Sequence, residues 1–509
     1  MPDIQNPYHD VDWEQVGYLH SMSHQHGGKN EASCETFYEM GYRHFAFSNY
    51  YPSQPIEALP AGFAQCHADV IVTPNAEHHS LSDTSLHFNG LGSRFASGYG
   101  QTVPPSQLEA CPVSARFDGL CTEAAASYPG QSLYRLDITI VSRDCTFSGP
   151  AAFLTVEGAL EHDPSGEGST RRRLVREPLC PGVRQIYLRV QHPSMEVRLE
   201  YDAGGHVIER MRLMQGMNRP WREAFRAVLD GESLGGCHQP GLEEREGGLT
   251  LNHPVEDFRH YLPMLDFDPR VLGVEVWNYR RGFGSPLSFY QVWDDILRTG
   301  RRCWGFFVKD HRMYERGRNI LLVPKGKASS PGEREKAALR AYRRGAFFGS
   351  VGALSVDRTG KPVAPFDRSD FRFSRISVGR DNRRRPRNIE VRVEGNDPLL
   401  RPNVQVRLIT AKGVELIVDG PVAVFPLEMS AQELLSRRFI RVEAFACPDR
   451  DGDGRSLTGE ALRKMDVAQV AALRTGGEPE NGTPAADMIF SQPLRVVSND
   501  AESRPESLE

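Results

Sequence analysis

An interruption in the pattern of strands and helices most constrains how this chain can fold. From Tyr18 to Gly92, strand-length apolar runs alternate with helix signals, which is typical of repeated βα units. Between about 98 and 247 the pattern changes to alternating apolar and polar residues separated by turn-forming residues, which is typical of antiparallel strands. The βα pattern returns from Leu249 onward. The sequence therefore predicts one α/β domain that is split by a β-rich insertion.

The segment after about Pro365 again alternates apolar and polar residues, and it predicts a terminal β-sandwich. A chain of 509 residues is long enough for roughly two to four domains, because single hydrophobic cores stop growing at about 250–300 residues. We expect these segments: the first part of the split domain at 1–97, the insertion at 98–247, the second part at 248–364, the sandwich at 365–498 with an acidic loop at 449–460, and a disordered tail at 499–509.

Composition and charge exclude several classes of protein. The formal net charge of -5 gives no electrostatic reason to expect a nucleic-acid partner. The first residues form no secretory signal, and no stretch approaches the roughly 18 apolar residues of a membrane span, so we expect a cytoplasmic protein without a membrane partner. The nine cysteines are scattered and odd in number, which argues against a disulfide framework. The oligomeric state stays open.

Metal-ligating side chains recur in five separated places that follow predicted strands. Imidazole and carboxylate groups together suit zinc or manganese, with iron as a further option. Because the carboxyl ends of parallel strands meet on one face, distant residues can converge there. One histidine taken alone is more often a core or surface residue, but five such groups favour a site for one or two divalent ions. The groups are His20, His24 and His26; Glu77, His78 and His79; His87; His253; and Asp310 and His311.

The arrangement of these motifs resembles the PHP (polymerase and histidinol phosphatase) superfamily. The relevant stretches are LHSMSHQHG, GYRHFAFSNYY, TPNAEHH, TSLHFNGLG, LNHP, GVEVWN and WGFFVKDHR. The resemblance covers about residues 15–95 and 245–355. It implies a distorted (β/α)7 barrel, interrupted here by the β-rich insertion and followed by the β-sandwich, with up to three metal ions. It also implies a metal-dependent hydrolase that acts on a small phosphorylated molecule, most simply as a phosphoesterase.

The resemblance assigns roles to individual residues. His20 matches the first histidine of the family, and the third element falls on His26 or His24, which spacing does not separate. Asp310 and Glu77 are the expected catalytic carboxylates, which bridge the metal or orient the attacking water. The expected metal ligands are His20, His26, Glu77, His87, His253, Asp310 and His311. The residues expected to support these ligands are His24, His78, Tyr50 and Lys309.

Two positions depart from the family pattern. Met22 stands where the second histidine belongs, and Asn49 and Tyr50 replace the expected aspartate and histidine. Methionine is a poor ligand for hard divalent ions, so at least one metal of the family's three should be lost. This leaves an alternative reading, in which the chain is a catalytically weakened PHP-like scaffold whose β-rich parts bind a partner or a glycan.

An acidic segment near the end of the chain has the spacing of a calcium loop. The run DRDGDGRSLTGE places acidic residues at positions one, three, five and twelve of an EF-hand loop: Asp449, Asp451, Asp453 and Glu460. The loop follows a predicted strand instead of a helix, and Ser456 replaces the usual aliphatic residue. Calcium binding and an acidic surface insertion are therefore both open.

Overall fold

The structure is a computed structural model of the chain. It divides into two compact units: the first comprises Met1–Ser48, Ile56–Asn75 and Arg245–Glu509, and the second comprises Asn49–Pro55 and Ala76–Glu244. None of the described helices is both long and apolar enough to span a bilayer. The described residues are 2–28, 30–49, 55–79, 81, 83–94, 99–102, 113–118, 132–142, 152–157, 175–179, 182–190, 194–201, 206–215, 220–234, 237–242, 247–278, 287, 289–313, 316–326, 330–352, 370–399, 401–451, 454–475, 483–484 and 486–498.

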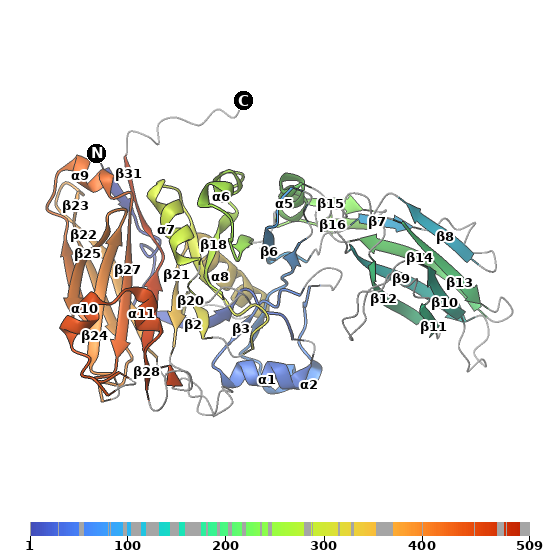
Figure 1. Cartoon of the computed structure of the whole chain (residues 1–509), viewed down its shortest axis with the longest axis horizontal. Helices are drawn as coiled ribbons and strands as arrows, with labels where there is room; N and C mark the ends of the chain where they lie inside the picture. The colour runs from blue at the N-terminus through green and yellow to red at the C-terminus, as the bar shows by residue number, and fades with distance from the viewer. Residues whose placement is uncertain are drawn as a thin grey trace. The chain divides into compact units, whose positions relative to one another are not determined.

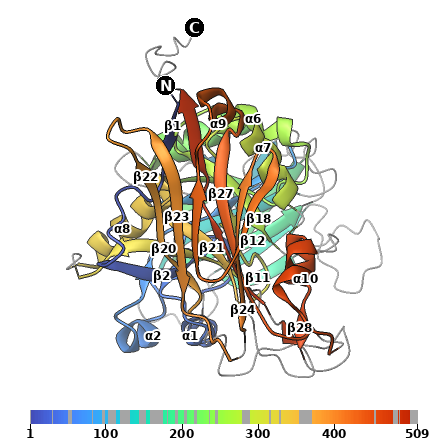
Figure 2. The ribbon, with the colours of Figure 1, turned by 90° about the vertical axis from the view of Figure 1, so that its left-hand side faces the viewer.

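A large mixed sheet forms the framework of the first unit (Figures 1 and 2). Its strands lie in the order β1-β31-β27-β30-β21-β20-β2-β3-β4, and β24 and β25 extend it beside β27. The strands are β1 (Pro2–Gln5), β2 (Val16–Met22), β3 (His44–Phe45), β4 (Ile71–Val72), β20 (Gly317–Pro324), β21 (Phe347–Val351), β24 (Asn403–Thr410), β25 (Gly413–Asp419), β27 (Phe439–Cys447), β30 (Asp487–Ser491) and β31 (Leu494–Ser498).

Smaller sheets complete the strands of this unit. A parallel set carries much of the candidate site: β17 (Gly248–Asn252), β18 (Val271–Trp277) and β19 (Trp304–Phe307). Every residue of β18 is buried, as expected for a parallel strand covered on both faces. An antiparallel set contains β22 (Arg372–Arg380), β23 (Pro386–Glu394) and β26 (Val422–Pro426). A short pair contains β28 (Arg474–Thr475) and β29 (Thr483–Pro484).

The prediction of a (β/α)7 barrel is wrong. β2, β3 and β4 pair in parallel, as do β17, β18 and β19, but the described strands form no closed ring. The reason is β20, which runs antiparallel along β2 and continues through β21 to β30. This strand occupies the edge of β2 that a closing parallel strand would need. The C-terminal strands, expected as a separate sandwich, therefore share one sheet with β2.

The helices of the first unit have clear local signals. In α8 (Pro331–Arg344), Ser330 and Glu333 form a capping box, and Gly345 ends the helix with a φ of 74°. The other helices are α1 (Glu31–Glu39), α2 (Ala61–Cys66), α6 (Phe258–Leu265), α7 (Tyr290–Arg298), α9 (Ala431–Ser436), α10 (Gly459–Lys464) and α11 (Val467–Ala471).

The main hydrophobic core of the first unit lies between the three-stranded sheet and the large sheet. Phe373 of β22 and Phe425 of β26 pack in one cluster with Val442 of β27 and Ile320 of β20. These four side chains are almost completely buried. One continuous core therefore ties the C-terminal strands to the strand that follows the candidate site.

The second unit is rich in antiparallel strands. Two four-stranded sheets have the orders β11-β10-β13-β8 and β12-β9-β14-β7, and the antiparallel pairing expected for this stretch is confirmed for its described strands (Figure 1). The unit contains β5 (Glu77–His78), β6 (His87–Leu91), β7 (Tyr99–Thr102), β8 (Val113–Asp118), β9 (Ser132–Ser142), β10 (Ala152–Glu157), β11 (Val175–Leu179), β12 (Gly182–Val190), β13 (Ser194–Tyr201), β14 (His206–Gln215), α5 (Trp221–Asp230), β15 (Gly231–Leu234) and β16 (Cys237–Pro240).

A buried ion-pair network joins α7 to the large sheet. Arg441 of β27 is fully buried, and its Nε lies 2.9 Å from Oδ1 of Asp294 on α7. The same guanidinium bonds to Glu443 and to the hydroxyl of Tyr290. Removing the guanidinium would leave two buried carboxylates without their cation, which is far more costly than losing an exposed pair.

We therefore expect Arg441→Leu to lower the free energy of unfolding by about 3–5 kcal/mol, measured by urea denaturation. The matched control is Arg463→Leu, because Arg463 pairs with Asp419 and both side chains are nearly half exposed. The control should lose less than about 1 kcal/mol. Similar losses in the two variants would contradict the assignment.

A second buried network is uncharged and joins β2 to β3 and α8. The Ser21 hydroxyl lies 2.6 Å from His44 Nδ1 and 2.6 Å from the Tyr342 hydroxyl, and His44 Nε2 lies 2.8 Å from Thr73 Oγ1. Burial lowers the pKa of His44 to about 3, so the folded chain keeps this imidazole neutral. The network therefore opposes protonation of a group that titrates freely when the chain unfolds.

This difference predicts acid sensitivity. Because the unfolded chain binds a proton at this residue below about pH 6.5, stability falls by up to about 1.4 kcal/mol per pH unit from there to about pH 3. In His44→Gln, the plot of unfolding free energy against pH should be shallower by that amount between pH 6 and 4. The exposed His9→Gln should leave the slope unchanged, and an unchanged slope in His44→Gln would refute the expectation.

Candidate metal site

Two distant chain segments are fixed against each other beside β2. The backbone N–H of Asp310 donates to the carbonyl of His24 at 3.1 Å, and the N–H of His26 donates to the carbonyl of Asp310 at 3.2 Å. His24 and His26 follow β2 directly, and Asp310 follows β19. The end of a strand thus positions each of these side chains, as the sequence indicated.

Asp310 is the centre of a group of imidazoles in the first unit. Its Oδ1 lies 3.3 Å from Nε2 of His24 and 3.3 Å from Nε2 of His26. Nε2 of His311 lies 3.6 Å from the same oxygen, and the His311 ring stacks on the His26 ring with centroids 4.0 Å apart. His24 and Asp310 are buried, whereas the His311 side chain is 59% exposed. The group therefore reaches from the interior to solvent.

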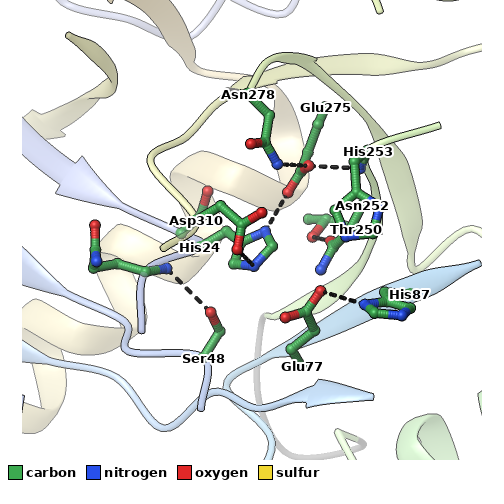
Figure 3. Close-up of polar contacts among 12 residues, drawn as sticks. His24, Ser48, Glu77, His87, Thr250, Asn252, His253, Glu275, Asn278 and Asp310 are labelled. Atoms are coloured by element: carbon green, nitrogen blue, oxygen red, sulfur yellow. Dashed lines mark hydrogen bonds and ion pairs between the residues drawn. The ribbon is translucent and has the colours of Figure 1, made fainter. Parts of the chain in front are cut away.

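Glu275 on β18 determines which nitrogen of His24 faces Asp310 (Figure 3). Its Oε1 lies 2.5 Å from His24 Nδ1, while Oε2 accepts the backbone N–H of His253 at 2.6 Å and the side-chain amide of Asn278 at 2.7 Å. A buried carboxylate requires donors, so Nδ1 of His24 carries a proton. Nε2 of the same ring then faces Asp310.

Two of the candidate ligands have left-handed backbone conformations. His253 has a φ of 28° and Asp310 a φ of 56°, and only four non-glycine residues of the described chain have positive φ. Such conformations cost about 1–3 kcal/mol and persist where the surrounding structure requires them, often at functional sites. The strain at these positions supports a functional role for their side chains.

In the second unit, the antiparallel pair β5 and β6 positions a carboxylate and an imidazole. Glu77 pairs with Asn89 across the two strands, and Oε1 of Glu77 lies 3.0 Å from Nδ1 of His87 (Figure 3). Glu77 is fully buried and His87 is 15% exposed. The neighbouring His78 points elsewhere, because its ring stacks on Phe88 with centroids 4.7 Å apart.

The described residues contain two groups of side chains that could hold a metal ion. The first unit supplies His24, His26, His253 and Asp310, and the second unit supplies Glu77 and His87. The ligand atoms of His24, His26 and Asp310 lie within 4.8 Å of one another. Metal–ligand bonds of about 2.1 Å place tetrahedral ligand atoms about 3.4 Å apart. The two 3.3 Å distances at Asp310 match that spacing.

Several residues predicted from the sequence lie outside both groups. His20 contacts Arg318 instead, with its Nδ1 3.2 Å from Nη1 of the arginine. The Lys309 ammonium bonds to the Met313 carbonyl at 3.4 Å and lies over the Tyr42 ring. His311 and His78 belong to neither group. Tyr50 lies outside the described residues.

The candidate calcium loop does not gather its acidic side chains into a further group among the residues described. Glu460 is exposed and pairs with Lys464 along α10, and the Asp449 carbonyl accepts the N–H of Leu457. The Asp451 carboxylate accepts the N–H of Arg455. Asp453 lies outside the described residues. These contacts are typical of an acidic surface turn.

Sequence reasoning gave Glu275 no place in the site and gave His24 only a supporting one. The signal for Glu275 was available, since it is a lone acidic residue inside the apolar run VLGVEVW. A buried carboxylate in such a strand needs several hydrogen-bond donors, which polar sites supply. A scan of known protein-family models finds no match to this chain, and a search of curated proteins finds none.

The role of Glu275 gives a direct prediction. A glutamine at this position has one acceptor oxygen, so its NH₂ group would face either the N–H of His24 or the backbone N–H of His253. Two donors would then point at each other. We expect Glu275→Gln to weaken zinc or manganese binding by about 10- to 100-fold, measured by titration against a competing chelator. The exposed Glu428→Gln serves as the control and should bind as the parent does. Unchanged affinity in Glu275→Gln would show that this carboxylate does not orient the ligands.

Proposed function

We propose that the chain is a metal-dependent hydrolase that uses one or two divalent ions. The observation that carries the proposal is the position of Asp310 Oδ1, which lies 3.3 Å from Nε2 of both His24 and His26. Two imidazole nitrogens and a carboxylate oxygen that converge at this spacing are ligands that one divalent cation can bind.

The ligand chemistry favours zinc or manganese, because imidazole and carboxylate groups occur together. A divalent ion bound here supplies a Lewis acid and lowers the pKa of a bound water. We propose that Asp310 orients that water and accepts its proton, and Glu77 is the second carboxylate that the motif resemblance suggests for this role.

A phosphoester is the substrate class that we propose, on the strength of the motif resemblance to PHP proteins. His253 follows β17, and its backbone N–H is bound by Glu275, so its ring is presented at a fixed strand end. We also propose a cytoplasmic location. It is supported by the free state of all four cysteines whose side chains are described.

A weakened scaffold is the alternative, and one observation favours it. Met22, at the family position of a histidine ligand, is buried in an apolar cluster with Phe37, Phe45 and Phe47. That position therefore contributes packing instead of coordination. A chain that binds metal but turns over no ester would fit this alternative.

The hydrolase proposal predicts activity on phosphomonoesters or phosphodiesters in the presence of zinc or manganese. Asp310→Asn should lower kcat/KM by at least about 100-fold, equivalent to roughly 2.7 kcal/mol. The reason is that a neutral amide replaces the negatively charged carboxylate that lies between His24 and His26. The exposed Asp397→Asn is the control and should retain parent activity.

Metal content measured on the same preparations separates the outcomes. Less than one equivalent of metal after growth in supplemented medium would rule out the hydrolase. Full activity in Asp310→Asn would place the reaction at another site.

A further inference from the structure

Three neighbouring hollows surround the first strand and its loop in the first unit. Their volumes are about 450, 630 and 860 Å³. The first and second share Asp3 and Arg380, and the first and third share Arg302 and Arg344, so they form one continuous groove. We name it the arginine groove, after Arg302, Arg344, Arg380, Arg383, Arg384 and Arg385. None of its lining residues belongs to the candidate metal groups.

The groove concentrates positive charge in a chain with a net charge of -5. Its lining contains ten lysine and arginine side chains but four carboxylates. One of these carboxylates, Asp3, is already paired with Arg380 at 2.6 Å. Burial lowers the pKa of Arg302, and the nearby charge of Arg495 lowers it further. Positive charges crowded in this way repel one another, and an anion bound among them relieves the repulsion.

A rigid turn presents three of these arginines between β22 and β23 (Figure 2). The Asp381 carboxylate accepts the backbone N–H groups of Arg383 and Arg385, each at 2.9 Å. These bonds hold the pKa of Asp381 at about 2, so the carboxylate stays charged. The turn therefore keeps its shape without help from a ligand.

Arg384 has a φ of 60° in this turn, a conformation in which glycine or asparagine costs less. The side chains of Arg383 and Arg384 are exposed and make no hydrogen bond or ion pair with any residue that the structure describes. The turn thus holds two guanidinium groups at the groove that have no hydrogen-bond or ion-pair partner among the described residues.

We propose that the arginine groove binds a small ligand that carries several phosphate groups in a row. Guanidinium groups match phosphate oxygens in paired, charge-assisted hydrogen bonds, which favours phosphate over isolated carboxylates. The hollows have the size of small-molecule sites, which favours a compact ligand over a polymer. The proposal does not depend on the metal site or on its hydrolytic role.

The test is calorimetric titration of the full chain with inorganic tripolyphosphate. Metal is first removed with a chelator and the protein desalted, so that binding at the metal groups does not contribute. We expect one ligand per chain, and Arg383→Gln/Arg384→Gln should weaken binding at least tenfold. The control is Arg375→Gln/Arg392→Gln, which removes the same charge from a cross-strand pair of the same hairpin outside the groove. It should change affinity by less than twofold.

Three results would overturn the proposal. The first is no binding of tripolyphosphate by the parent chain. The second is an equal loss of affinity in the control, which would show a general charge effect. The third is equally tight binding of a hexaglutamate peptide, which would show a surface that takes any anion. Urea unfolding of each variant confirms that the chain is folded in every titration.

Discussion

The Glu275 carboxylate is the constraint on which the candidate site depends. It is buried on β18 and accepts hydrogen bonds from residues that follow three different strands: His24 after β2, His253 after β17 and Asn278 after β18. One side chain thus sets the protonated nitrogen of His24 and holds the backbone of His253. The ligand atoms are arranged by a residue outside both ligand groups, as is common in metal proteins.

Left-handed backbone conformations occur both at candidate metal ligands and in the arginine groove. Of the four non-glycine residues with positive φ in the described chain, two are candidate ligands and one is Arg384. In two of these cases a carboxylate holds the costly conformation by hydrogen bonds, Glu275 at His253 and Asp381 around Arg384. The chain therefore uses buried or fixed carboxylates to present polar side chains at defined places.

The sequence predicted local features well and long-range pairing poorly. The ends of predicted strands gave His26, Glu77, His87, His253 and Asp310 as ligand candidates. The barrel failed because the direction in which β20 pairs with β2 depends on contacts between distant segments, which residue patterns do not encode. For the same reason, spacing left His24 and His26 as alternatives, although the structure places both beside Asp310.

The continuous sheet from β4 to β1 makes the C-terminal strands a structural support for the part that carries the candidate metal ligands. β21 pairs with β30 along one edge and with β20 along the other, and β20 pairs with β2. A truncated chain that stopped before β22 would leave β21 as a bare edge and would uncover Phe348 and Ile320. The region that looks like an appended module from its composition therefore pairs and packs with the strands that precede the candidate metal ligands.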